Sequence, residues 1–471
     1  MASRLAKRSG QAKRGPGEEA AQPRPGWQQP PPRTATPATV GARVPAPRPG
    51  PTGFLPKAPK TLEGTGINLK WLEGLVAKLL LDAPGLTGFQ ISRRICLAHA
   101  PTAELLDGMK QRRLVARAAA TRTGDFKYEL SDAGKSTALD ARKASLYVGP
   151  APVSLDQYLE SVAAQSVARA RPKKEELDRS MKDLILAPGM LEQLGPAIAS
   201  GRALFLYGPP GNGKTSIAER LIKTFGSHAW IPHAVEIDGY IVKLLDPHVH
   251  DEDPLPDADA NIDRRWVRCK RPCVVVGGEL TLDDLDMTFN SNTGVCDSPV
   301  QMKANCGILV VDDFGRQRAR PEELLNRWIV PLERQIDYVG LPNGRRVAVP
   351  FDPMVVFSTN LNPSALVDDA FLRRIPYKVL VEDPTEPLFR QLLHVMCKAL
   401  DVEPSEQAFD YLISVHYGAT GRPFRFCHPR DILSQIRDMA KWEGQPARLT
   451  REYIDRACRN YFIARAAPID L

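Results

Sequence analysis

The segment RALFLYGPPGNGKTS, residues 202–216, decides the fold. It begins with a short apolar run, continues into a glycine-rich turn, and ends where a helix can start. Gly208, Gly213, Lys214 and Thr215 fill the pattern GxxxxGK[ST]. Glycines let the backbone curl so that its N–H groups face phosphate oxygens, and the start of the following helix adds positive potential. The strand before this turn and the helix after it therefore predict a nucleotide-binding loop.

The candidate nucleotide-binding residues of this loop are consecutive: Gly208, Pro209, Pro210, Gly211, Asn212, Gly213, Lys214, Thr215 and Ser216. In such a loop the lysine reaches the terminal phosphates, and the hydroxyl of the following Thr ligates Mg²⁺.

A second stretch, GILVVDDFGRQ at residues 307–317, supplies carboxylates. Four apolar residues predict a buried strand that ends in Asp312 and Asp313. Adjacent like charges at a strand end cost free energy unless a cation or catalysis compensates. Since ligands gather at the carboxyl ends of parallel strands, we expect Asp312 to hold Mg²⁺ and Asp313 to face an attacking water. The alternative, two aspartates that only cap a helix, fits this pattern less well.

Further apolar runs alternate with helical segments. They lie at residues 273–278, 355–360 and 377–380, and the second of them ends in Asn360. Alternation of this kind predicts a doubly wound parallel α/β sheet. Between the carboxylates and Asn360 the sequence predicts a helix and then a hairpin with an Asn343-Gly344 turn.

The N-terminal part of the chain has a different composition. Its first 60 residues hold 13 prolines and a net charge of +9, whereas the remaining residues carry −1. Such a tail buries too little surface to offset chain entropy, so we expect it to be disordered. It is a solvated spacer or an arm that touches polyanions. We find no secretion signal or membrane span and expect a soluble protein.

From residue 67 to residue 148 the pattern is three helices followed by two short strands. One helix places Leu72, Leu75 and Leu79 on one face, and the next opens with a capping box from Thr87 to Gln90. This order resembles a winged helix-turn-helix domain, an α+β fold. The third helix mixes acidic with basic residues, so docking of a protein is as well supported as binding of DNA.

The eight dispersed cysteines indicate reduced thiols in a cytoplasm. A zinc site of Cys269, Cys273, His248 and His250 is a less favoured alternative, because both histidines lie in an acidic segment typical of a surface loop.

Residues 175–466 resemble an AAA+ ATPase, in which the two stretches above are Walker A and Walker B. The resemblance implies that FSTN is the sensor-1 segment, with Asn360 polarising the water. It also implies that DDAFLRRIPYK carries an arginine finger, Arg374 or Arg373, and that Arg430 in CHPRDI reaches the nucleotide from a helical lid. The segments MTFNSNTGVCDSPVQ and PFDPMVVFSTNLNP are similar to the MoxR-like branch.

The resemblance implies ATP and Mg²⁺ as cofactors, a homo-oligomeric ring, and an arginine that acts on the adjacent subunit. One departure is Asp313 where the family usually has Glu, which shortens the candidate base by one methylene. The expected parts are a disordered tail, a winged-helix domain, a linker, an AAA+ domain and a lid, at residues 1–62, 63–150, 151–174, 175–385 and 386–471.

Two functions follow. The first is a ring-forming ATPase that remodels a protein or nucleoprotein partner engaged by the N-terminal domain. The second is a nucleotide-switched regulator that binds DNA through the winged-helix domain and the basic tail, with little turnover. The stretch VVVGGELTLDD lacks the aromatic residue that peptide-threading relatives carry, so local remodelling is favoured over threading.

Overall fold

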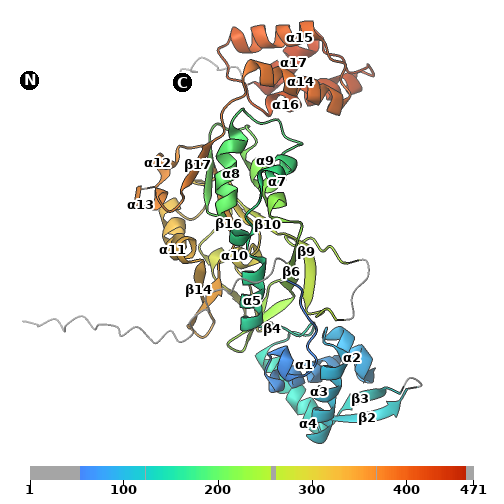
Figure 1. Ribbon diagram of the computed structural model, residues 1–471. Helices are drawn as coiled ribbons and strands as arrows, with labels where there is room; N and C mark the ends of the chain where they lie inside the picture. The colour runs from blue at the N-terminus through green and yellow to red at the C-terminus, as the bar shows by residue number, and fades with distance from the viewer. Residues whose placement is uncertain (1–53, 122–123, 256–260, 368, 463–471) are drawn as a thin grey trace, which may run out of the picture. The chain divides into compact units, whose positions relative to one another are not determined.

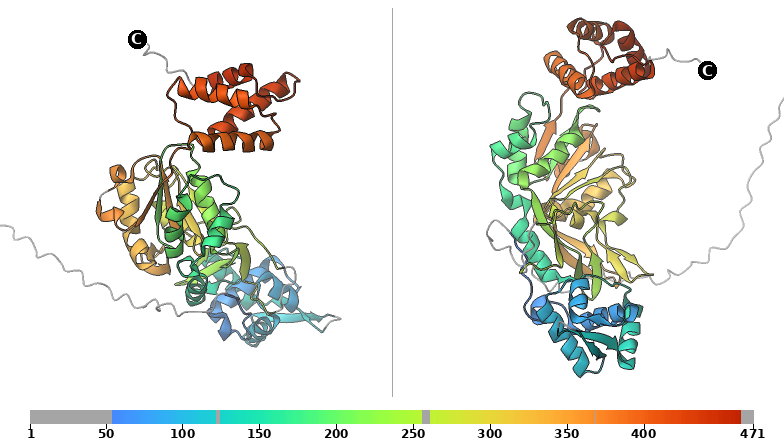
Figure 2. Two further views of the ribbon diagram at one scale, coloured as in Figure 1. Left: turned by 45° about the horizontal axis from the view of Figure 1, so that its top comes forward. Right: turned by 90° about the vertical axis from the view of Figure 1, so that its right-hand side faces the viewer.

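The computed structural model describes residues 54–121, 124–255, 261–367 and 369–462 (Figure 1, Figure 2). Most of the predicted tail lies outside these residues. Residues 54–62, which the sequence placed in the tail, contact the body of the protein instead. Asp263 donates its backbone N–H to Pro56 O over 3.0 Å, and the rings of Phe54 and Trp266 lie 5.2 Å apart edge to face.

The N-terminal domain contains the three predicted helices and the predicted ribbon. Its elements are η1 (Glu63–Thr65), α1 (Leu69–Asp82), β1 (Leu86–Thr87), α2 (Gly88–Arg94), α3 (His99–Gln111), β2 (Val115–Ala120), β3 (Phe126–Leu130) and α4 (Asp132–Ala144). The capping box forms, because Thr87 and Gln90 exchange side-chain hydrogen bonds with each other's backbone N–H. Two elements were not predicted. The short β1 pairs with β3 in an antiparallel sheet of order β1-β3-β2, and α4 packs against α1.

The body is built on a five-stranded parallel sheet. Its strands, in the order β10-β13-β16-β5-β17, are β10 (Cys273–Val276), β13 (Ile308–Val311), β16 (Met354–Thr359), β5 (Leu204–Tyr207) and β17 (Tyr377–Leu380). All four neighbouring pairs are parallel, as the alternation of strands and helices predicted.

Helices cover both faces of this sheet (Figure 1). Leu204 and Val310 point to the face covered by α8 (Met190–Ser200) and α9 (Lys214–Leu221). Phe205 and Val311 point to the other face, where Trp328 of α11 (Pro321–Arg334) is fully buried. Both faces are therefore dry at the inner strands β5 and β13, which is why these two read as unbroken apolar runs, whereas the edge strand β17 carries the exposed Lys378. The remaining helices of the body are α7 (Lys174–Ser180), η2 (Ile222–Phe225), η3 (Asp283–Leu285), α10 (Val300–Lys303), α12 (Pro363–Leu366) and α13 (Asp369–Leu372).

A second sheet was not predicted. Its strands, in the order β11-β12-β8-β7-β4, are β11 (Thr288–Asn290), β12 (Val295–Asp297), β8 (Tyr240–Lys243), β7 (Ala234–Ile237) and β4 (Val153–Ser154). Two further antiparallel pairs are β6 (His228–Pro232) with β9 (Trp266–Lys270), and β14 (Ile336–Gly340) with β15 (Arg346–Pro350). The last pair is the predicted hairpin, and Gly344 in its turn has φ +80°.

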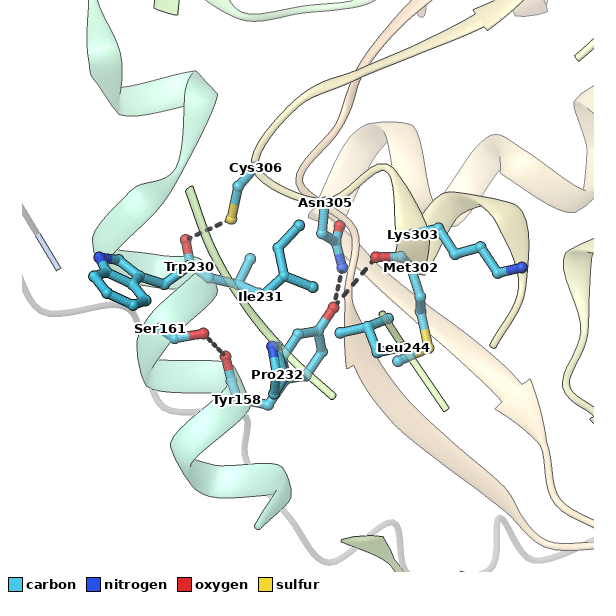
Figure 3. Close-up of a pocket in the computed structure, with 11 residues that line it drawn as sticks. Tyr158, Ser161, Trp230, Ile231, Pro232, Leu244, Met302, Lys303, Asn305 and Cys306 are labelled. Carbon is cyan, nitrogen blue, oxygen red and sulfur yellow. Dashed lines mark hydrogen bonds between the residues drawn. The ribbon is translucent and has the colours of Figure 1, made fainter. Parts of the chain in front are cut away.

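The predicted linker at 151–174 is part of this body. It contains β4, α5 (Leu155–Gln165) and α6 (Val167–Ala170). Tyr158 of α5 is buried, and Asn305 donates its side-chain amide to Tyr158 Oη over 2.8 Å in a small pocket (Figure 3). This packing was not evident from the polar sequence, because only about two side chains of each helical turn face inward.

The C-terminal helical domain matches the predicted all-helical ending. Its helices are α14 (Glu386–Leu400), α15 (Glu406–Tyr411), the π-helix η4 (Leu412–Gly418), α16 (His428–Trp442) and α17 (Arg451–Tyr461). They enclose a core of their own that includes Phe389, Phe409 and Ile436. Across the residues described, no helix combines the length and the apolar character needed to cross a bilayer.

Candidate functional site

The site is assembled where three neighbouring strands of the parallel sheet end. The glycine-rich turn follows β5, the two aspartates follow β13, and Asn360 follows β16, which lies between the other two strands. Because parallel strands end at the same edge, segments separated by about 100 residues meet there.

The turn requires its glycines. Gly208 has φ +139° and Gly211 has φ +81°, conformations that other residues rarely adopt. A Cβ at Gly208 would lie 2.5 Å from Val381 O, and one at Gly211 would lie 2.5 Å from Cys427 Sγ. Gly213, with φ +77°, directly precedes α9. The backbone therefore passes close to both neighbouring segments before the helix begins.

Lys214 connects the turn to Asn360. Its buried ammonium donates hydrogen bonds to Gly208 O and Pro209 O, each over 2.9 Å, and to Asn360 Oδ1 over 2.6 Å. Burial lowers the pKa of Lys214, and the nearby charge of Arg425 lowers it further, while Asp312 and Asp313 oppose this shift. A polyanion placed beside Lys214 would favour its charged form.

The two carboxylates play different parts. Thr215 donates its hydroxyl to Asp312 Oδ2 over 2.9 Å, so two oxygen ligands suited to a hard cation lie side by side. Asp313 is exposed and accepts a hydrogen bond from Asn360 Nδ2 over 3.1 Å. Asp313 has φ +48°, a left-handed conformation that costs an L-residue about 1 kcal/mol. The turn is nevertheless fixed, because Phe314 donates its backbone N–H to Ser358 O of β16 over 2.7 Å.

The predicted arginines do not join this cluster. Arg374 donates Nε to Glu333 of α11 over 2.6 Å. Arg373 is exposed, and its side chain makes no hydrogen bond or ion pair within the described part of the chain. Arg430 has a side chain 67% exposed and pairs with its neighbour Asp431 over 3.0 Å, not with the glycine turn.

Two residues that the sequence did not single out lie against the turn. Asp383 accepts a hydrogen bond from Asn212 Nδ2 over 2.7 Å and forms an ion pair with Arg425. Both charges lie in irregular segments, after β17 and before α16, where no periodicity or spacing identifies them. Only the close approach of these segments to Gly211 and Asn212 reveals their place.

The alternative zinc site does not form. Both ring nitrogens of His250 are engaged by the backbone: Nδ1 accepts from Asp246 N, and Nε2 lies 2.9 Å from Lys303 O. Burial raises the pKa of the Cys269 thiol to about 12 and that of Cys273 to about 11, which disfavours the thiolates that a metal needs. Among the described residues, no three or more His, Cys, Asp or Glu side chains cluster in a way that could hold a metal ion such as zinc.

Geometry therefore defines an α/β protein with a phosphate-loop type of turn at the carboxyl edge of a parallel sheet. A family model described as a domain of unknown function (DUF8689) matches residues 385–460, the C-terminal helical domain. A comparison with curated proteins found no match.

Solved structures with a similar arrangement include three of RuvB from Thermotoga maritima. Two are of variants, each 14% identical over 61% of this chain, which cover 69% and 72% of the RuvB chains with TM-scores of 0.33 and 0.35. The third, described as a Holliday junction branch migration motor, is 14% identical and has a TM-score of 0.32, over 61% of this chain and 68% of that one. At these TM-scores the likeness carries no argument about function.

Proposed function

We propose that this chain is an Mg²⁺-dependent AAA+ ATPase that acts as a homo-oligomeric ring and remodels a protein or nucleoprotein partner. The observation that carries the proposal is two neighbouring sets of hydrogen bonds, one from Thr215 to Asp312, and one that joins Lys214, Asn360 and Asp313. These groups place three functions at one sheet edge: a cation that can bind phosphate, oxygen ligands that can bind a metal, and a carboxylate that can accept a proton from water.

The residues at this edge fit ATP and Mg²⁺. The backbone N–H groups of the turn and the Lys214 ammonium would hold the phosphates. Thr215 and Asp312 would hold Mg²⁺, which neutralises charge on the phosphates when it is bound. Asn360 orients the Asp313 carboxylate by its 3.1 Å hydrogen bond, so that Asp313 can accept a proton from an attacking water.

The arginine that acts on a neighbouring subunit is Arg373 in this proposal. Tyr377 of β17 pairs with Leu204 at the start of β5, and Arg373 precedes Tyr377 by four residues. Arg373 therefore lies toward the amino edge of the sheet, away from the Lys214 turn of its own chain. Arg374 is held by Glu333, whereas Arg373 is exposed. Arg373 can thus meet a nucleotide only in a second copy.

The N-terminal domain, which we take to be a winged helix, is proposed to engage the partner. Some charges on α3 and just after it are used within the chain: Glu104 accepts from Leu62 N, Asp107 pairs with Arg117, and Arg112, which follows the helix, pairs with Glu73. The exposed cations Lys110 and Arg113 lie close in sequence to these acidic groups, so the surface is mixed in charge and lacks the basic stripe typical of a DNA-binding helix. Protein docking by this domain is therefore favoured over DNA binding.

For the body of the protein, we propose the MoxR-like branch of the AAA+ class.

A cytoplasmic location completes the proposal. All eight cysteines are free thiols, which supports a reducing compartment.

Phosphate release from Mg²⁺-ATP by the full chain tests the function. We expect turnover, and we expect Asp313→Asn to lower kcat by about 10²-fold or more while ATP binding is kept, because the amide cannot accept the proton. Duplex DNA should leave turnover unchanged. Negligible turnover by the unaltered chain together with tight duplex binding would instead establish the nucleotide-switched regulator.

A further inference from the structure

A loop of the C-terminal helical domain, residues 425–427, runs along the glycine turn. Cys427 donates its backbone N–H to Gly211 O over 2.9 Å, and Phe426 N lies 3.4 Å from Asn212 Oδ1. The contact is close, because an added Cβ at Gly211 would overlap Cys427 Sγ. A change in the backbone of the turn must therefore displace this loop as well.

One carboxylate joins the turn to the loop. Asp383 accepts from Asn212 Nδ2 over 2.7 Å and pairs with the guanidinium of Arg425. Asn212 is buried, and its amide also donates to Glu382 O over 3.2 Å. The Arg425 and Asp383 side chains are 19% and 32% exposed, so the pair is only partly screened by water.

Arg425 lies within electrostatic reach of the candidate phosphate site. An added Cβ at Gly211 would lie 3.8 Å from Arg425 Cβ, so Arg425 and Lys214 are two cations beside the same turn. A guanidinium binds carboxylate and phosphate through the same planar arrangement of N–H donors. Asp383 and a nucleotide phosphate are thus alternative partners for Arg425. Arg430 is a poorer candidate, because it is two-thirds exposed and paired within its own helix.

We propose that Asp383 is an internal competitor for the nucleotide: it holds Arg425, and ATP binding transfers Arg425 from the Asp383 carboxylate to a phosphate oxygen. This inference rests on the proposed function, because it requires that the glycine turn binds ATP. Asp383 then weakens ATP binding, because its ion pair with Arg425 must break before Arg425 can reach a phosphate. The hold of Asp383 on the 425–427 loop therefore depends on whether ATP is bound. Arg425 and Asp383 together make the position of the helical domain depend on phosphate.

The test is the dissociation constant for Mg²⁺-ATP, measured by titration calorimetry on the full chain. We expect Asp383→Asn to bind ATP about 5-fold more tightly, because Arg425 is released, and Arg425→Ala about 10-fold more weakly, the worth of one charged hydrogen bond. In the double variant, Asp383→Asn should no longer raise the affinity for ATP, because the Arg425 guanidinium that it would release is absent. Arg437 and Asp438 on the outer surface of α16 form a matched pair, and Asp438→Asn should leave the affinity unchanged.

Unchanged or weaker binding by Asp383→Asn, with the melting temperature of the unaltered chain, would overturn the inference. So would equal gains from Asp383→Asn with and without Arg425. If Asp383→Asn does not fold, Arg425→Ala decides alone, and an unchanged affinity overturns the inference. Failure of the proposed function looks different: the unaltered chain then binds no ATP, or Lys214→Ala binds it equally well.

Discussion

The two five-stranded sheets of this protein differ in strand direction, and their roles differ with it. Every neighbouring pair in the parallel sheet runs the same way, so Lys214, Asp312 and Asn360 meet at one edge. The second sheet mixes directions: β7 and β8 are antiparallel, whereas β8 and β12 are parallel. Its strand ends therefore alternate between edges, and the buried Arg265 beside β4 is engaged within the chain by Asp263 and by two backbone carbonyls.

The second sheet instead presents an apolar surface. Ala234, Ile241 and Val295 are buried and pack with Trp71 and Tyr147 of the N-terminal region. A shared strand direction thus brings polar side chains together at one edge. Mixed directions leave a sheet whose face is suited to packing against other parts of the chain. Substitutions in the two sheets should therefore have different consequences.

Arg373→Ala should have the largest effect on turnover. We expect kcat to fall by about 10³-fold with ATP affinity kept, because a positioned cation stabilises charge only during phosphoryl transfer. The measurement is phosphate release at saturating Mg²⁺-ATP. Arg374→Ala is the matched comparison and should cost less activity, since Arg374 is held by Glu333. A larger loss in Arg374→Ala would reverse the assignment.

Lys214→Ala should have the next effect, on binding. Loss of the ammonium removes a charged contact to phosphate, and we expect ATP affinity to fall by about 100-fold. Calorimetric titration on the full chain measures it. A result within a factor of two of the unaltered chain would mean that the parallel sheet does not hold the nucleotide.

Gly294→Ala should destabilise the second sheet without changing ATP affinity. Gly294 has φ +65°, and an added Cβ would lie 2.3 Å from Ala144 O, so we expect a loss of about 2 kcal/mol in stability. Gly239→Ala in the same sheet is the control, because its φ is +87° but nothing lies within 4 Å of an added Cβ. Its loss should be about 1 kcal/mol, from backbone strain alone. Denaturant unfolding of both variants separates the effect of steric overlap from that of backbone strain. Equal losses of stability in the two variants would contradict the expected overlap at Gly294.

The smallest effect concerns pH. Burial, followed by the charges of Arg425 and Arg422, lowers the pKa of His428 from its ordinary 6.5 to about 4. Between these values the unfolded chain binds more protons, so this contribution to stability is complete above pH 6.5 and falls as the pH drops toward 4. At pH 5.5 the loss is about 1.4 kcal/mol. Melting temperatures at pH 7.5 and 5.5 should differ less for His428→Gln, and an equal difference would show that His428 does not titrate in this range.

Much of the parallel sheet was predictable because its signals are local. The turn after β5 and the aspartates after β13 are short strings with a chemical reason for each residue type. Three helices of the N-terminal domain, α1 to α3, were predictable from apolar spacing and from the capping box at Thr87, whereas α4 was not. The second sheet was not, since its strands are two to four residues long and come from segments as far apart as 153 and 297. Such strands are defined by their partners rather than by their own sequence.

The candidate site divides in the same way. The sequence by itself determined which residue types stand beside a phosphate and a metal, because the glycine turn, Lys214, Thr215 and the aspartates are each required by local backbone or ligand chemistry. Only the tertiary structure decided which arginines are available. Arg374 is bound to Glu333, Arg425 to Asp383, and Arg373 is exposed. The reason is physical: a long charged side chain takes its role from whichever opposite charge the fold brings within reach, and that partner lies far away along the chain.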